Sequence, residues 1–203
     1  MRIALAAAAV VMWYVAPAWA QAPTDATPAR VRGTVEKLDG NVLTVKTRDG
    51  QPQAITLAPD YKVSALVKKT LADIKQNDFV ASAGVKGTDG KIHAVEVRIF
   101  PEALRGAGEG QRPWDQSPDS VMTNASVTGT AAAPNGQVLT VTYKGTTSDY
   151  IVGPECPIFG YVAGDASLLK PGAAVFVSAQ KHPDGSLTAS RITAEKDGVK
   201  PQM

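Results

Sequence analysis

The chain has 203 residues, of which 44% are hydrophobic and 20% are charged, and its formal net charge is +2. Positive and negative residues are interspersed along the chain, so its bulk charge would not attract nucleic acid or an acidic membrane surface. Cys156 is the only cysteine, which excludes an internal disulfide.

Residues 1–20 have the composition of a secretory signal peptide. Arg2 is followed by an apolar run over residues 3–15 and by the small-x-small sequence Ala18-Trp19-Ala20. An uncleaved membrane anchor is the alternative, but the run is shorter than the about 20 apolar residues that a spanning helix needs. We therefore expect cleavage after Ala20, a periplasmic protein with no membrane span in the mature chain, and a disordered lead-in over residues 21–29.

Residues 30–100 contain the signals of five short strands and one helical turn. Strands are expected over residues 31–38, 42–48, 53–57, 79–86 and 91–100, with the helical turn over residues 70–75. Asp-Gly pairs separate several of these segments and favour hairpin turns, because glycine reaches positive φ without steric cost. In the last strand His93 alternates in phase with Val95 and Val97, which predicts that His93 faces the core.

Residues 125–195 repeat this pattern. The matching positions, at a single offset (129 − 33 = 96), are Gly33 with Gly129, Leu43 with Leu139, and Ile55 with Ile151. The Asp-Gly pair at 184–185 repeats the pair at 89–90 at an offset one residue shorter (184 − 89 = 95). A register held over the whole unit indicates internal duplication.

These patterns predict an all-β protein made of two tandem five-stranded OB-like barrels, each with a short helical turn. Barrels are favoured because closure removes the exposed strand edges of a small sheet. The first barrel would comprise residues 30–100 and the second residues 125–195, with a connector over residues 101–124 and a tail over residues 196–203. A small open β-sandwich spread over both copies is the alternative.

Several short motifs occur in both copies: Gly-Thr-Val or Gly-Thr-Ala, then Gly-x-x-Leu-Thr-Val, a turn ending in Ile-Lys or Leu-Lys, and Asp-Gly-x-x-x-Ala. This signature resembles a bacterial family of exported small β-barrel domains of unknown function. Residues 99–115, IFPEALRGAGEGQRPWD, are similar to the connector of a proteobacterial group whose members sometimes carry the label metal ABC transporter permease. Since a permease needs several spanning helices, the resemblance implies the fold and export, at most an accessory role in transport, and no catalytic residues.

Two histidines and one thiol are the candidate metal ligands. Neither His93 nor His182 has a cysteine or carboxylate at the spacing typical of a zinc or copper site. A metal site would have to join His182 to Asp184, or to Cys156 from another loop. No Lys, Arg or His adjoins Cys156, which favours an inert thiol. We therefore expect no metal and no other cofactor.

Motifs for catalysis are also weak. No serine lies in a nucleophile elbow, and a hydrolase would need a Ser or Cys near His93 or His182. The glycines at 106–110 are spaced one residue short of a dinucleotide-binding loop, and Pro113 stands where the helix of such a loop would begin. We expect a protein without enzymatic activity.

The connector is the segment best suited to binding. It contains Arg105, Arg112, Trp114 and Asp115, and a flexible spacer has little use for tryptophan and opposite charges. In one interpretation Trp114 fills the gap between the barrels and the arginines bond at the seam. In the other, these residues line a ligand-binding groove. Both hold if the connector forms one wall of the groove.

Taken together, the sequence predicts a periplasmic, non-enzymatic binding or adaptor protein, with an envelope protein, a peptide or a glycan as partner and no nucleic acid. The alternatives are a copper- or zinc-handling accessory of a transport system and an envelope hydrolase.

Overall fold

The computed structural model of the protein describes residues 26–134 and 136–201. The predicted signal peptide and most of the lead-in lie outside these residues. The described chain is almost entirely β-structure, which confirms the all-β prediction. Its strands are β1 (Thr27–Asp39), β2 (Val42–Thr47), β3 (Pro52–Lys69), β4 (Phe79–Lys86), β5 (Ile92–Ile99), β6 (Gly110–Pro113), β7 (Ser120–Ala133), β8 (Gly136–Tyr143), β9 (Thr146–Val152), β10 (Ile158–Gly164), β11 (Ala174–Lys181) and β12 (Leu187–Ala194).

Helical structure in the described residues is limited to three 3-10 turns. They are η1 (Leu71–Asp73), η2 (Glu102–Leu104) and η3 (Ala166–Leu168). η1 and η3 are the short helical turns predicted for the two copies. No helix in the described part of the chain has the length and apolarity to cross a bilayer.

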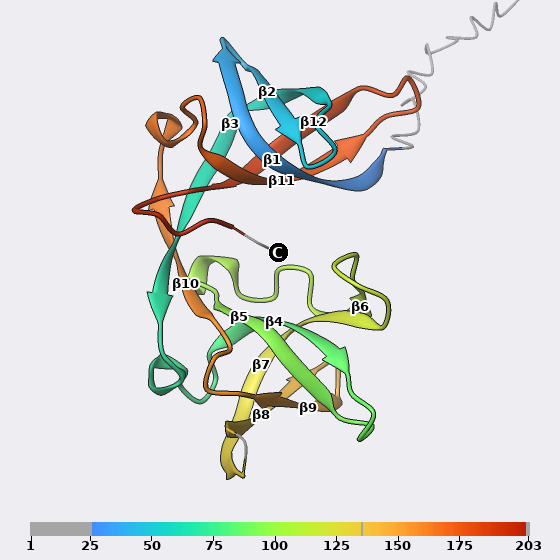
Figure 1. The fold of residues 1–203 in the computed structure, drawn as a ribbon, viewed down its shortest axis with the longest axis vertical. Helices are drawn as coiled ribbons and strands as arrows, with labels where there is room; N and C mark the ends of the chain where they lie inside the picture. The colour runs from blue at the N-terminus through green and yellow to red at the C-terminus, as the bar shows by residue number, and fades with distance from the viewer. Residues whose placement is uncertain (1–25, 135, 202–203) are drawn as a thin grey trace, which may run out of the picture.

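The strands form two closed five-stranded barrels, one above the other in Figure 1. In the first barrel β1 pairs with β2, β2 with β3, β3 with β12, β12 with β11, and β11 again with β1. The second barrel closes in the same way through β7, β8, β9, β5 and β4. Each barrel has one parallel pairing, β3 with β12 and β5 with β9. The closed barrels exclude the open sandwich.

The two repeats exchange strands, which corrects the expectation that each repeat closes its own barrel. The first barrel takes β1, β2 and β3 from the first repeat but β11 and β12 from the second. The second barrel takes β7, β8 and β9 from the second repeat and β4 and β5 from the first. The exchange is possible because the copies share one apolar pattern, so that a strand from either copy presents its apolar face to either core.

A two-stranded ribbon joins the barrels. β3 is 18 residues long, and its second half pairs with β10, from Val63 opposite Gly164 to Lys69 opposite Ile158. β3 also belongs to the first barrel through β12, and β10 pairs with β5 of the second. Figure 1 shows the two strands running along one side of both barrels.

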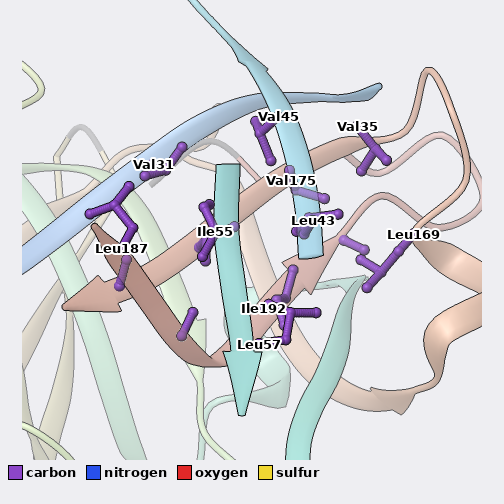
Figure 2. Packing of buried hydrophobic residues seen from close by; sticks show 14 of the residues in the cluster. Val31, Val35, Leu43, Val45, Ile55, Leu57, Leu169, Val175, Leu187 and Ile192 are labelled. Atoms are coloured by element: carbon purple, nitrogen blue, oxygen red, sulfur yellow. The ribbon is translucent and has the colours of Figure 1, made fainter. Parts of the chain in front are cut away.

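Each barrel has a core drawn from both repeats. In Figure 2, Leu43 and Ile55 of the first repeat lie close to Val175 and Ile192 of the second, and all four are at most 1% exposed. The second core likewise joins strands of the two repeats. Because each buried side chain of this kind contributes about 1.5–3 kcal/mol, each barrel depends on strands from the other repeat.

Two local expectations are wrong. β1 begins at Thr27, inside the predicted disordered lead-in, because Thr27 to Ala29 pair with β11. His93 does not face the core: its side chain is 48% exposed. Val95 is a bulge residue, since the pairing of β4 with β5 skips it, and a bulge reverses the face of the residues beyond it.

Candidate functional site

A cavity of about 270 Å³ lies between the two barrels. Strands of both barrels line it, together with the ribbon and the connector. It contains side chains of four arginines and four aromatic residues, and no Asp or Glu is among its described lining residues. We call it the inter-barrel cavity. Its arginines are Arg30, Arg98, Arg112 and Arg191, and its aromatic residues are Phe100, Trp114, Tyr161 and Phe176.

Equivalent faces of the two barrels form opposite walls of this cavity. Ala81 on β4 and Arg98 on β5 correspond to Phe176 on β11 and Thr193 on β12, at the offset found in the sequence (176 − 81 = 193 − 98 = 95). All four residues line the cavity. Duplication therefore brings two copies of one face together, and the copies present different side chains to the cavity.

The connector closes the cavity and is ordered by its own pairing. β6 adds to the second barrel at β7, from Gly110 opposite Asn124 to Pro113 opposite Val121. The chain then turns back: the Trp114 amide donates to the Ser120 carbonyl oxygen (2.8 Å), and the Ser120 hydroxyl donates to the Trp114 carbonyl oxygen (2.8 Å). These bonds fix the backbone from which the indole projects.

Trp114 is both a seam residue and a cavity residue. It is 8% exposed and packs with Met122 of the second barrel and Phe176 of the first. The Arg30 guanidinium lies 4.2 Å from its ring centroid, and that of Arg112 lies 5.8 Å away. Such cation–π contacts favour a fixed guanidinium position. The two predicted roles of Trp114 are thus geometrically compatible.

Asp115 ties the connector to the first barrel. Arg32 on β1 donates two hydrogen bonds to its carboxylate, at 2.9 and 2.8 Å, and Arg30 lies 3.9 Å from it. The Arg32 hydrogen bonds are the main reason that the pKa of Asp115 is lowered. Asp115 does not line the inter-barrel cavity, so its observed contacts are those of an anchor.

Arg105 and Arg112 occupy different environments. Arg105 lies outside the cavity and donates to the Glu102 carboxylate (2.6 and 2.7 Å) and to the Asn77 carbonyl oxygen (2.8 Å). It fastens the connector to the second barrel. Arg112 lines the cavity and donates to the Gly108 carbonyl oxygen (3.0 Å). Burial, and secondarily the charge of Arg30, lower the pKa of Arg112.

Arg98 is the most buried charge of the site. It is 1% exposed, forms an ion pair with Glu96, and donates from Nη1 to the Tyr161 hydroxyl (3.1 Å). Burial raises the pKa of Glu96, and the charge of Arg98 opposes that rise. The guanidinium stays protonated at any pH that a folded protein meets.

Three residues lining the cavity carry a buried polar atom without a hydrogen-bond partner in the described structure. The atoms are Nη2 of Arg98, Nε1 of Trp114 and Oδ1 of Asn124. The Asn124 amide nitrogen donates to the Ala107 carbonyl oxygen (2.8 Å), which fixes Oδ1 as an acceptor. Unpaired buried groups of this kind cost about 1–3 kcal/mol each, and a cost concentrated at one cavity indicates a functional site.

The candidate metal ligands lie apart from this cavity. The His93 imidazole pairs with Asp89 (3.1 Å), and His182 Nε2 lies 2.9 Å from the Thr188 hydroxyl. Within residues 26–134 and 136–201, no group of three or more His, Cys, Asp or Glu side chains gathers as a metal site would require. Burial, with a smaller contribution from Glu96, raises the pKa of the Cys156 thiol to about 11, so the thiol is protonated at neutral pH.

Sequence reasoning found two cavity residues, Arg112 and Trp114, and missed the other three arginines. Arg30 stood at the edge of the predicted lead-in. Arg98 stands between two apolar residues and Arg191 between a serine and an isoleucine, as solvent-facing side chains of a strand often do. The strand exchange brings these arginines to one cavity, and no local sequence pattern predicts the exchange.

Comparisons of the chain with models of known protein families, with curated proteins and with solved structures give no match. The fold and the cavity therefore define the class: a two-barrel protein with a cavity between its barrels.

Proposed function

We propose that the protein is a periplasmic, non-enzymatic binding protein whose ligand is a small molecule held in the inter-barrel cavity. The leader over residues 1–20 supports export. The observation that carries the proposal concerns the buried side-chain polar atoms without a hydrogen-bond partner in the described residues: of the four, three belong to residues that line this cavity, Arg98, Trp114 and Asn124. Ligand sites fall preferentially between domains and combine apolar walls with a few polar groups. The cavity is too small to enclose a protein or a long peptide.

A pair of variants on β11 tests the proposal. Ser178 is exposed and lines the cavity, so Ser178→Tyr should block its rim without disturbing a core. Gln180 is exposed two residues further along and does not line the cavity. Gln180→Tyr is therefore a matched control, because side chains two apart share a strand face.

Native mass spectrometry of protein purified from the periplasm gives the readout. We expect a bound small molecule in the wild type and in Gln180→Tyr, and its loss in Ser178→Tyr. Thermal melting with the low-molecular-weight fraction of a periplasmic extract should show the same order, since a ligand that binds only the folded state raises the melting temperature. A ligand retained equally by both variants, or no ligand in either assay, would reject the cavity as the binding site.

A further inference from the structure

The charge around the inter-barrel cavity is unbalanced. In the described part of the chain, its four arginines and the neighbouring Arg32 form ion pairs with only two carboxylates, those of Glu96 and Asp115. Asp115 is occupied by two hydrogen bonds from Arg32. A cluster of guanidinium groups with so few anions repels itself. Burial is the main cause of the lowered pKa of Arg112, and the nearby charge of Arg30 adds to it.

Several guanidinium donors at this cavity are unused. Nη2 of Arg98 is buried without a partner. In the described part of the chain, no hydrogen bond or ion pair joins the guanidinium group of Arg191, which is an exposed residue, to another group, and the one side-chain hydrogen bond of Arg112 uses Nη1. Arginine presents its donors in a planar fork that matches the two oxygens of a carboxylate or phosphate.

The remaining surface of the cavity is suited to an apolar body. Met122 and Ala81 pack with Trp114 on one side, and Phe176 comes from the facing barrel. A volume of about 270 Å³ is near the lower end of the range for small-molecule sites, roughly 300 Å³. The site therefore combines oxyanion recognition with a compact apolar pocket.

We infer that the inter-barrel cavity binds a small organic anion, with its carboxylate or phosphate group on the lining arginines and its apolar body against Trp114 and Phe176. This inference rests on the proposed function and names the chemical class of its ligand. The anion supplies the missing negative charge, and it gives the buried Arg98 donor an acceptor.

Equilibrium dialysis with four probes tests the inference: 2-naphthoate, 2-naphthyl phosphate, the neutral 2-naphthamide, and inorganic phosphate. The protein is the chain from Gln21, which contains every residue that the structure describes. We expect at least one naphthyl anion to bind about tenfold or more tightly than 2-naphthamide and than inorganic phosphate, because both the charge and the apolar body contribute. The two anions distinguish a carboxylate site from a phosphate site. Binding should weaken as salt is added.

Matched arginine variants assign the charge to the cavity. Arg112→Gln and Arg191→Gln should each weaken anion binding about tenfold and leave 2-naphthamide unaffected. Arg48→Gln removes the same charge from the exposed turn between β2 and β3, outside the cavity and away from the connector, and should leave both unchanged. Far-ultraviolet circular dichroism checks that each variant is folded. Loss of anion binding in Arg48→Gln to the same extent would overturn the inference.

The remaining outcomes separate the inference from the proposed function. If 2-naphthamide binds as tightly as the anions and Ser178→Tyr blocks it, the anion class is wrong and the cavity is still a binding site. If no naphthyl probe binds, the anion inference is wrong, while the co-purified ligand and its loss in Ser178→Tyr decide the proposed function separately.

Discussion

Asp115 is the residue at which pH acts on the seam between the barrels. Its pKa is lowered mainly by the hydrogen bonds that Arg32 donates, with the charges of Arg32 and Arg30 adding to the effect. An acid whose pKa is lower in the folded state stabilises the fold above its unfolded pKa, which is about 3.9 for Asp. That stability is lost as the pH falls through the folded pKa.

Replacement of Asp115 by Asn should reveal this contribution. We expect Asp115→Asn to lower the free energy of unfolding by about 0.5–1 kcal/mol at pH 7, a small value because the side chain is 44% exposed and solvent screens the pair. The difference from wild type should shrink as the pH falls below about 3.9 and vanish only below the lowered pKa of folded Asp115, where the carboxyl group is protonated in both states. Urea unfolding across this range measures it, and a difference that stays constant down to pH 2 would contradict the pairing.

The residue scale also shows what sequence can and cannot reveal about the site. Arg112 and Trp114 were recognisable because tryptophan and paired charges are unusual in a linker, and both lie in the connector. Arg98 could not be recognised in this way, because a charged residue alternating with apolar ones is the ordinary pattern of a strand with one solvent-exposed face. That face is covered here in part by Tyr161 of β10, whose hydroxyl accepts a hydrogen bond from Arg98 Nη1, and such coverage is a property of the tertiary structure.

The first strands of the two repeats, β1 and β7, are bulged differently although their sequences correspond. Pairing with the next strand skips Glu36 in β1 but Thr128 in β7. The two matching glycines consequently meet different surroundings. A Cβ at Gly33 would lie 2.0 Å from the Lys46 carbonyl oxygen, whereas one at Gly129 would lie 3.8 Å from its nearest neighbour, Thr140 Cβ.

The same substitution should therefore have different effects in the two strands. Gly33→Ala should destabilise the protein by about 1–3 kcal/mol, since the backbone of β1 or β2 must shift to admit a methyl group. Gly129→Ala should change the stability by no more than about 0.5 kcal/mol, or raise it slightly by restricting the unfolded chain. Chemical denaturation of both variants decides the point, and equal losses would show that the close approach in β1 is absent.

Strand positions were largely predictable and strand limits were not. The Asp-Gly pairs mark hairpins, and Gly50, Gly90 and Gly185 all adopt positive φ. β3 continues past the predicted end at Leu57 because Pro59 falls where its pairing with β12 shifts register, a place in a sheet that tolerates proline. The pairing partners that reveal this are more than a hundred residues away.

At the scale of the whole molecule, the shared ribbon should couple the two barrels. Leu43 and Leu139 are matching core residues, one in each barrel, and both are 0% exposed. We expect Leu43→Ala and Leu139→Ala each to lower the stability of a single unfolding transition by about 2–5 kcal/mol. Circular dichroism, which reports both barrels, and the fluorescence of Trp114 between them should give coincident curves.

Separate transitions would contradict this coupling. In that case Leu43→Ala would shift one transition and Leu139→Ala the other, and the two barrels would unfold as independent units. A double variant provides the control, because substitutions in distant cores should have additive effects on one shared transition.

The exchange of strands could not be predicted, and the reason is the duplication itself. Two copies with one apolar pattern allow β4 and β5 to complete a barrel with β1, β2 and β3, or with β7, β8 and β9, equally well in terms of hydrophobic alternation. The straight course of β3 into the ribbon carries the chain away from the first barrel before β4 begins. The course of β3 between the barrels therefore determines which pairing forms, whereas the apolar patterns of the strands do not distinguish the two pairings.

The exchange of strands also determines the order in which the two barrels can close during folding. The strands of the second barrel are continuous in sequence, from β4 to β9, whereas the first barrel is interrupted by all of them. In topological terms one barrel is an insertion in the other. A chain synthesised from its N-terminus can close the second barrel once Val152 is available. The first barrel cannot close before Ala194 is available, and until then the free edges of β1 and β3 have no barrel partner. Long-range closure of this kind is intrinsically slow, so the cavity between the barrels is the last part of the molecule to form.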